Sequence, residues 1–369
     1  MTVLPRPYDG QHLGDRPHVA VIFRDQIGDF LVATPLMRGF RERFPRLVLD
    51  YLGGERTREL EAASDLIDAR YSLYGRESDL SALRRFLSAR RDEAGGYDLA
   101  INLELDTRAA EACSLIDARF VAGRVAADSS SEARVVHAGR HVDRLWTDMA
   151  WNRSTLLQDF PELTSQFIGE IFCRLARVET DFTKTEAPIV EAPVDTPEVL
   201  LSTGANRVAK LWPATHWLAV ARWLRESGRA VGLLGAPPGN DTYHVADTDD
   251  ALIRAGVRDL RGALSLPQVA GALARAAIFL TVDNGLMHLG SAAGARCVAL
   301  FGASPQRLWA PRGKNVHIVE PTLPCGLCEE NRFRNTHCLL PVHQCMTTIE
   351  PERVIQEIQT VLAGGCTRP

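Results

Sequence analysis

The feature of this sequence that most constrains its fold is a regular alternation of short apolar runs with stretches of helical spacing. In the first half, apolar runs at 19–23, 48–52 and 99–103 predict buried strands. A helical repeat of apolar residues at 31–44 and a polar-rich helical stretch at 79–91 lie between them. This alternation is typical of βαβ units built around a parallel sheet.

A segment with three prolines and several acidic residues, 184–198, interrupts this pattern and predicts a linker. The alternation then restarts, with strands expected at 199–202, 230–234, 278–282 and 297–301 and helices at 214–227, 266–276 and 285–293. A chain of 369 residues is long enough for two domains that each bury a core. We therefore expect an α/β protein with domains at 1–183 and 199–349. A final amphipathic helix within 350–369 is a candidate to pack back on the first domain.

Charge and hydropathy exclude other classes of protein. The 42 basic and 46 acidic residues give a formal charge of -4 without long blocks of one sign, which argues against a nucleic-acid binder. No apolar run approaches the roughly 18 residues of a membrane span, and residues 1–17 do not resemble a secretion signal. We therefore expect a cytoplasmic protein without a transmembrane segment.

Ligands of open α/β sheets bind beyond the carboxyl ends of the strands, so the turns after the strands are the first places to search for a site. In the turn at 24–29, Gly28 permits a tight bend and Asp29 falls at the start of a helix. An acid in the first turn of a helix is also a common stabilising feature. Spacing alone favours that structural interpretation of Asp29.

Two turns of the second half carry further candidates. In 202–213, small residues that include Thr203 and Gly204 let a backbone approach a ligand, and Lys210 supplies a positive charge suited to phosphate. An ordinary surface loop with a solvated lysine is an equally good interpretation.

The third turn follows the expected strand 278–282 and reads Asp283, Asn284, Gly285 and then His288 one helical turn later. A helix that begins here would offer its first N–H groups to an anion. Taken alone, the turn is better explained by capping residues and a buried histidine. The signature motifs of dinucleotide oxidoreductases, P-loop enzymes, zincins and serine hydrolases do not occur in the sequence.

Together the three turns resemble glycosyltransferase family 9, the family of ADP-heptose:lipopolysaccharide heptosyltransferases. The matching text is Arg24-Asp25-Gln26-Ile27-Gly28-Asp29 with Thr34-Pro35-Leu36-Met37-Arg38 and Phe44-Pro45, Thr203-Gly204-Ala205 with Lys210-Leu211-Trp212-Pro213, and Asp283-Asn284-Gly285-Leu286-Met287-His288-Leu289 with Ala299-Leu300-Phe301-Gly302. The resemblance implies a GT-B fold, in which two Rossmann-like domains face each other across a cleft. It also implies metal-independent, inverting sugar transfer, with the acceptor on the first domain and a nucleotide sugar on the second.

The resemblance also assigns roles to residues. Asp29 matches the general base that takes the proton of the acceptor hydroxyl, with Arg24 and Gly28 on the acceptor side. The donor-side positions that match are Thr203, Gly204, Lys210, Asp283, Asn284, Gly285 and His288. Of these, Lys210 and the amides at Gly285 are expected to meet the charge of the leaving diphosphate. Asp241 stands where the family has the acid that holds the ribose, although that acid is usually the longer Glu. Asn284 stands where the family usually has Thr or Ser.

Four cysteines, Cys325, Cys328, Cys338 and Cys345, give the pattern C-x2-C-x9-C-x6-C. The first pair has the spacing of a metal knuckle, so the pattern predicts a structural zinc or iron site. Buried free thiols are an alternative, as is a mixed site in which His337 or His343 replaces one cysteine. The cluster also resembles the cysteine-held iron of the autotransporter heptosyltransferases. That branch has an added N-terminal domain, which we expect to be absent here.

The leading hypothesis is therefore transfer of a heptose from an ADP-linked donor to a glycan, a lipid-linked glycan or a protein. Peripheral attachment to the inner membrane would follow if the acceptor is lipid-linked. A second hypothesis keeps the fold but uses another nucleotide sugar and a small natural-product acceptor. A third, from a different class, is a metal-binding interaction module. The oligomeric state is left open by the sequence.

Overall fold

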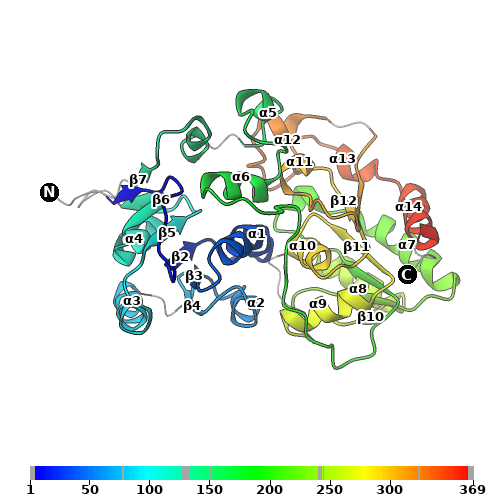
Figure 1. Ribbon diagram of the computed structural model, residues 1–369. Coiled ribbons are helices and arrows are strands. Elements are labelled where there is room, and N and C mark those ends of the chain that lie inside the picture. Colours follow the sequence, from blue (N-terminus) through cyan, green and yellow to red (C-terminus); the bar gives the residue numbers. More distant parts are fainter. Residues whose placement is uncertain are drawn as a thin grey trace. The chain divides into compact units, whose positions relative to one another are not determined.

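The computed structural model describes residues 5–76, 79–126, 133–148, 151–239, 243, 245–322 and 325–364. The chain divides into two compact units, Met1–Glu186 and Ala187–Pro369, each with its own sheet (Figure 1). The division falls inside the segment 184–198, which forms neither helix nor strand. This segment is nevertheless anchored in part, because the N–H of Val190 donates to the carbonyl of Pro267 over 3.0 Å.

The sheet of the first unit has seven strands in its described part, in the order β1-β6-β5-β2-β3-β4, with β7 paired to β6. The strands are β1 (Arg6–Pro7), β2 (His18–Ile22), β3 (Val48–Gly53), β4 (Ala69–Ser72), β5 (Leu99–Asn102), β6 (Phe120–Ala126) and β7 (Ala133–Val136). All neighbours are parallel except β6 and β7. The three strands expected from apolar runs are therefore the central ones, which are covered on both faces.

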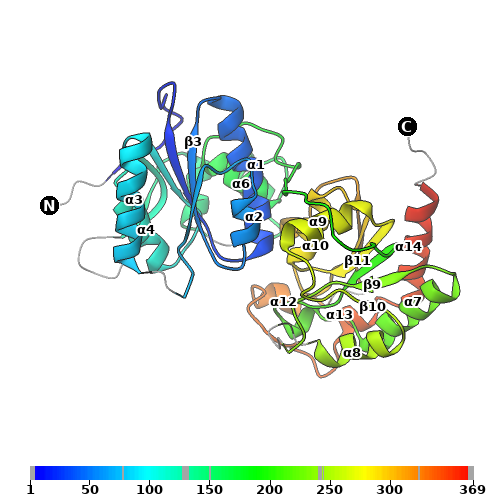
Figure 2. The ribbon, with the colours of Figure 1, turned by 90° about the horizontal axis from the view of Figure 1, so that it is seen from below.

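Helices cover both faces of this sheet (Figure 2). The helical elements are α1 (Ile27–Arg43), α2 (Arg58–Ala62), α3 (Leu80–Ala94), α4 (Thr107–Ile116), the 3₁₀ helix η1 (His141–Trp146), α5 (Leu156–Asp159) and α6 (Ile168–Leu175). α3 and α4 pack on one face, where Leu83, Leu87 and Ile116 join a core with Ala20 and Ile22 of β2. α1 packs with α6 on the other face.

The second unit contains a fully parallel sheet in the order β10-β9-β8-β11-β12-β13. Its strands are β8 (Val199–Ser202), β9 (Val231–Leu233), β10 (Arg258–Asp259), β11 (Ile278–Val282), β12 (Cys297–Leu300) and β13 (Val316–Val319). Its helical elements are the 3₁₀ helix η2 (Val208–Lys210), α7 (Ala214–Glu226), α8 (Ala246–Arg254), α9 (Leu266–Arg275), α10 (Gly285–Ala292), α11 (Gln306–Trp309), α12 (Leu327–Glu330), α13 (Gln344–Thr347) and α14 (Pro351–Gly364).

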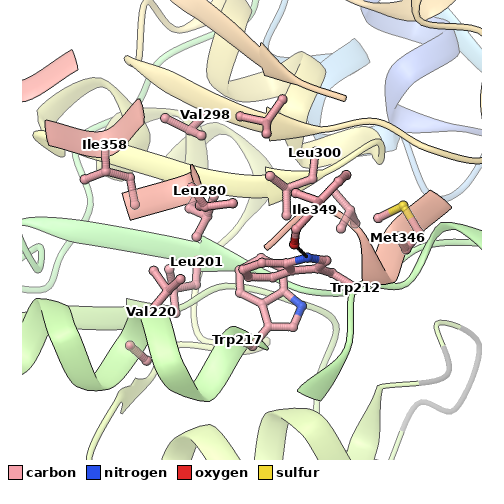
Figure 3. Close-up of a cluster of buried hydrophobic side chains, with 14 of the residues drawn as sticks. Leu201, Trp212, Trp217, Val220, Leu280, Val298, Leu300, Met346, Ile349 and Ile358 are labelled. Atoms are coloured by element: carbon pink, nitrogen blue, oxygen red, sulfur yellow. Dashed lines mark hydrogen bonds between the residues drawn. The ribbon is translucent and has the colours of Figure 1, made fainter. Parts of the chain in front are cut away.

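The core of the second unit is organised around two tryptophans (Figure 3). Trp217 of α7 packs against Trp212 with the two rings nearly perpendicular, 82° apart. The indole Nε1 of Trp212 donates to the carbonyl of Ile349 over 2.8 Å. This bond joins the loop before α7 to the segment before α14, and it satisfies a donor that would be costly to bury alone.

The final helix differs from the expectation that it packs back on the first half of the chain. Val354, Ile358 and Val361 of α14 are buried in the core of the second unit. α14 lies against α7 and the strands β11, β12 and β13. These apolar residues recur every three or four positions, so they form a single stripe, and the sheet of the second unit covers that stripe.

No helix in the described part of the chain is long and apolar enough to cross a membrane.

Candidate functional site

Both sheets have a switch point, a place where the chain reverses the direction in which it adds strands. In the first unit, β2 is followed by β3 and β4 on one side and later by β5 and β6 on the other. In the second unit, β8 is followed by β9 and β10 on one side and later by β11, β12 and β13 on the other. Loops diverge at the carboxyl ends of such strand pairs, which is where α/β sheets bind ligands. The three turns identified in the sequence follow β2, β8 and β11, all of them strands at the two switch points.

Asp29 lies in the first turn of α1, where it is buried to 8% exposure. It does not cap the helix, because the N-cap is Gln26, and its carboxylate is stabilised there by the positive end of the helix dipole. Gly28 differs from the expectation. α1 already begins at Ile27, so Gly28 is a helical residue, and the bend comes before it.

At the first switch point, the guanidinium of Arg24 lies near two carboxylates, those of Glu104 and Asp29. Its Nε and Nη2 atoms donate to Glu104 over 2.6 and 2.5 Å, and Nε lies 3.6 Å from Asp29 Oδ2. The hydrogen bonds to Glu104 raise the pKa of Arg24, so the guanidinium stays charged. Half of the Arg24 side chain is exposed, whereas Glu104 is buried. The arrangement leaves one cation between two acids at the edge of a buried site.

Glu104 and Tyr51 are site residues that sequence reasoning missed. Glu104 follows β5 by two positions, so the rule that ligands bind beyond strand ends could have identified it. Tyr51 of β3 is fully buried, and its hydroxyl has no hydrogen-bond partner within the described residues. Burial raises the pKa of Tyr51 well above its usual value, and the charges of Glu61, Asp29 and Glu104 add to the rise in that order. The hydroxyl of Tyr51 is therefore neutral at pH 7.

At the second switch point, Lys210 and Asp283 form an ion pair in which Asp283 is buried and Lys210 is partly buried. Lys210 Nζ lies 2.7 Å from Asp283 Oδ2 and 3.4 Å from the carbonyl oxygen of the same residue. Burial alone would raise the pKa of Asp283, but the Lys210 ammonium outweighs burial and holds that pKa below its usual value. Lys210 lies in the loop that follows strand β8, and Asp283 directly follows strand β11. The sequence interpretation of Lys210 as a solvated surface residue is therefore wrong.

His288 lies one turn into α10 and is 4% exposed. Burial lowers the pKa of His288 to about 4, so the ring is neutral at pH 7. Its Nδ1 atom is buried without a hydrogen-bond partner in the described residues. A buried polar atom left unpaired in a native protein marks strain or a place where a ligand completes the bonding.

Asn284 has the structural role that the sequence analysis gave as the alternative. Its Oδ1 accepts from the N–H of Met287 over 2.9 Å, which caps α10. Both hydrogens of its amide are also used, since Nδ2 donates to Ser202 Oγ and to the carbonyl of Gly204. The expected contact between this side chain and a donor stays a prediction, and the hydrogen bonds that Asn284 makes here hold the two loops together.

The remaining donor-side candidates are placed as follows. Thr203 uses its hydroxyl to donate to Asp249 of α8. A Cβ atom on Gly204 would lie 3.0 Å from Tyr243 Cβ, so glycine allows close packing of the two residues there. Gly285 is the first residue of α10, whose opening N–H groups lack partners within the helix. Asp241 lies outside the described residues.

The four cysteines lie in one segment, residues 325–345, which we name the cysteine segment. Burial, and then the other three thiols, raise the pKa of Cys345 to about 12. Asn335 Nδ2 donates to Cys328 Sγ over 3.4 Å, and the N–H of Leu340 donates to Cys338 Sγ over 3.5 Å.

The expected metal site is not formed by this arrangement. Among the described residues, no group of three or more His, Cys, Asp or Glu side chains is placed to hold a metal ion. Cys328 and Cys338 each accept a hydrogen bond from their own segment. His343 is also engaged, because its Nε2 lies 2.6 Å from the carbonyl oxygen of Ala209.

Known proteins resemble this chain in sequence and in fold. Lipopolysaccharide heptosyltransferase 2 of Escherichia coli K12 is 28% identical over 158 residues, which are 42% of this chain and 43% of that protein. The match thus spans less than half of that relative's length.

Among solved structures, a family 9 glycosyl transferase from Veillonella parvula has a TM-score of 0.69 at 19% identity, over 95% of this chain and 98% of the other. The iron-containing dodecameric heptosyltransferase TibC, solved with ADP-D-β-D-heptose, has a TM-score of 0.56 at 15% identity, over 99% of this chain and 81% of TibC. These likenesses confirm the expected GT-B fold class. The family model of glycosyltransferase family 9 (heptosyltransferase) matches residues 86–338, more than half of the sequence. This match shows the family, and the strand order of the two sheets agrees with it. The chain therefore belongs to glycosyltransferase family 9, the heptosyltransferases.

Proposed function

We propose that this protein is an inverting heptosyltransferase that moves a heptose from an ADP-activated donor to a hydroxyl group of a sugar or a protein. The observation that carries the proposal is the ion pair of Lys210 and Asp283 beside the start of α10. A diphosphate is attracted to a fixed ammonium and to the N–H groups that open a helix. Both lie together at the second switch point, which supports this unit as the donor-binding domain.

Residues of the proposed donor site stabilise the negative charge of the leaving diphosphate. As the bond between the anomeric carbon and the diphosphate oxygen breaks, its electron pair stays with the diphosphate. Lys210 and the first amides of α10 stabilise that charge, and they are held in place before the reaction begins. Neutral His288 offers a hydrogen bond to the donor without adding charge.

The acceptor side supplies the base. A sugar or serine hydroxyl must lose its proton as its oxygen forms the new bond to the anomeric carbon. Asp29 takes that proton in our proposal, since its carboxylate is buried at the first switch point. Arg24 lies 3.6 Å from this carboxylate and orients it, and Glu104 holds Arg24 in place through two hydrogen bonds.

Donor binding tests the second unit. We expect calorimetry to show that the wild-type protein binds ADP and ADP-heptose, and that Lys210→Met weakens both by about 10- to 100-fold, the size of a lost hydrogen bond to a charged group. Lys314→Met is the control, because Lys314 is an exposed lysine of the same unit. Equal binding of ADP by Lys210→Met would refute this site. Tighter binding of a UDP-sugar would favour the alternative function with another donor.

Transfer tests the first unit. We expect Asp29→Asn to reduce release of ADP from ADP-heptose in the presence of acceptor by about 100- to 10,000-fold, with ADP affinity unchanged. Asp65→Asn, on an exposed surface, is the control. Glycan, lipid-linked glycan and peptide acceptors are compared in parallel. Full activity of Asp29→Asn with any of them would show that another group is the base.

We also propose that the cysteine segment holds a structural metal ion. The chemistry of the segment supports a thiolate-preferring metal, since its four cysteines include a C-x2-C pair. The thiols would have to converge on the ion, because no three of them are placed around one point among the described residues. Cys325, Cys328, Cys338 and Cys345 would hold it, and it would supply folding energy only. Metal analysis of the purified protein is expected to find about one iron or zinc per chain, lost in Cys328→Ser and kept in Cys113→Ser. A metal-free, folded wild type would contradict this.

A further inference from the structure

The loop that carries Lys210 is held in place by the cysteine segment. The N–H of Ala209 donates to the carbonyl of Thr336 over 2.9 Å. On the other side of the same residue, His343 Nε2 lies 2.6 Å from the carbonyl oxygen of Ala209. A carbonyl can only accept, so His343 donates here. Ala209 is fully buried, and both of its backbone polar groups are therefore satisfied by one distant segment.

Arg207 adds a second connection between the same two segments. Its Nη1 donates to the carbonyls of Phe333 and Asn335 over 2.9 and 3.0 Å, and its Nη2 donates to the carbonyl of Ala303. Burial lowers the pKa of Arg207, as expected for a guanidinium drawn out of water to make these bonds. The cysteine segment thus contacts the loop at residues 207 and 209, immediately before Lys210.

This loop needs support from outside. Its only regular element among the described residues is the 3₁₀ helix η2 (Val208–Lys210), a single turn whose hydrogen-bond geometry is intrinsically poor. Lys210 is the last residue of that turn and places its ammonium 2.7 Å from Asp283. A shift of the Ala209 peptide would move the backbone of Lys210 and hence the start of its side chain.

We propose that the cysteine segment positions the diphosphate-binding lysine, with His343 as a positioning residue that acts through the carbonyl of Ala209. The proposal rests on the proposed role of Lys210 in donor binding. It gives the cysteine segment a task in the reaction, which is to fix the donor loop, and it explains why the Nε2 of a histidine beside Cys345 faces a backbone carbonyl.

Two variants of His343 test this role. His343→Ala removes the donor, whereas His343→Gln retains an N–H at the same number of bonds from the backbone. We expect His343→Ala to raise the donor KM and the Kd for ADP about tenfold and to lower kcat as well, because a displaced Lys210 binds the diphosphate less well and stabilises less of the charge that develops on it in the transition state. His343→Gln is expected to restore these constants to within about threefold of the wild type.

A control separates positioning from general stability. His317→Ala removes another histidine hydrogen bond of the same unit, the one from His317 Nδ1 to Glu357, away from the loop. We expect it to leave the donor KM unchanged even if the melting temperature falls. If His343→Ala is folded and binds ADP like the wild type, or if His343→Gln binds as weakly as His343→Ala, the proposal is wrong.

Hydrogen exchange distinguishes failure of this proposal from failure of the proposed function. In His343→Ala, the amides of 207–211 are expected to exchange faster than in the wild type, and in His343→Gln they are expected to be protected again. This readout needs no ligand. If Lys210→Met binds ADP normally, the donor role of Lys210 is wrong, whereas unchanged exchange at 207–211 in His343→Ala would show that His343 does not hold the loop.

Discussion

At the residue scale, the guanidinium of Arg24 interacts with two carboxylates, and it binds Glu104 more tightly than Asp29. Arg24 makes two short hydrogen bonds to Glu104, but its nearest approach to Asp29 is 3.6 Å. The charge of Arg24 is therefore matched mainly by Glu104. Arg24 thus lies near the carboxylate of Asp29 and can orient it, while its two hydrogen bonds go to Glu104.

Glu104→Gln tests this division of charge. A neutral amide cannot match Arg24, so we expect the guanidinium to turn to Asp29 and make it a weaker base. The acid limb of the pH profile of kcat/KM should then move about one unit lower, and kcat should fall about tenfold. Glu111→Gln, at an exposed position of α4, is the control. A profile identical to the wild type would contradict the role of Glu104.

At the scale of elements, α14 completes the second unit. Its buried stripe contains Ile358, which packs beside Leu280 and Val298 of the sheet (Figure 3). The segment just before the helix accepts the hydrogen bond of Trp212 through the carbonyl of Ile349. α14 therefore stabilises both the sheet and the loop that leads into α7.

We expect Ile358→Ala to lower the free energy of unfolding of the second unit by about 2–5 kcal/mol, because Ile358 is fully buried and its loss leaves a cavity. Gln359→Ala, at the neighbouring exposed position, should change it by less than about 0.5 kcal/mol. Chemical denaturation followed by tryptophan fluorescence measures both, since Trp212 and Trp217 lie in this core. Equal effects of the two substitutions would refute the packing of α14.

At the scale of the whole molecule, each unit has a core of its own, and we propose that each is a domain. In the first unit, the buried carboxylate of Asp50 on β3 links three other parts of the unit. Arg90, His18 and Tyr97 all hydrogen-bond to its carboxylate, although they come from α3, β2 and the segment before β5. Burial alone would raise the pKa of Asp50, but these partners outweigh burial and lower it below 3.8.

Asp50→Asn is expected to destabilise the first unit by about 3–5 kcal/mol, because it removes the buried charge that pairs with Arg90 and leaves that guanidinium only the exposed Glu93. In the wild type, the lowered pKa means that the contribution of Asp50 is fully present above about pH 4. It is lost as the pH falls through the folded-state pKa. Hydrogen exchange should show lost protection in the first unit while β8, β11 and β12 stay protected. Asp92→Asn on the surface of α3 is the control. Equal loss in both units would argue against separate domains.

The central strands of both sheets and the turns that carry Asp29, Lys210 and Asp283 could be predicted from local sequence alone, whereas six further described strands, β1, β4, β6, β7, β10 and β13, were not. The predicted features are local, because burial repeats along a strand or a helix every few residues and loop residues follow directly. The sequence was less informative about α14, whose apolar stripe was evident but whose partner was not. It also suggested a ligand role for Asn284, which stays a prediction beside the hydrogen bonds that this side chain makes within the protein.

Which of these residues contact each other became evident only from the folded chain. Strand order places β2 beside β5 and β8 beside β11, and this brings Glu104 to Arg24 across 80 positions of the chain. It likewise took the folded chain to bring His343 to Ala209 across 134 positions. Such pairings depend on the order in which strands add to a sheet and on which segment covers a loop, and neither is encoded in the periodicity of a single segment.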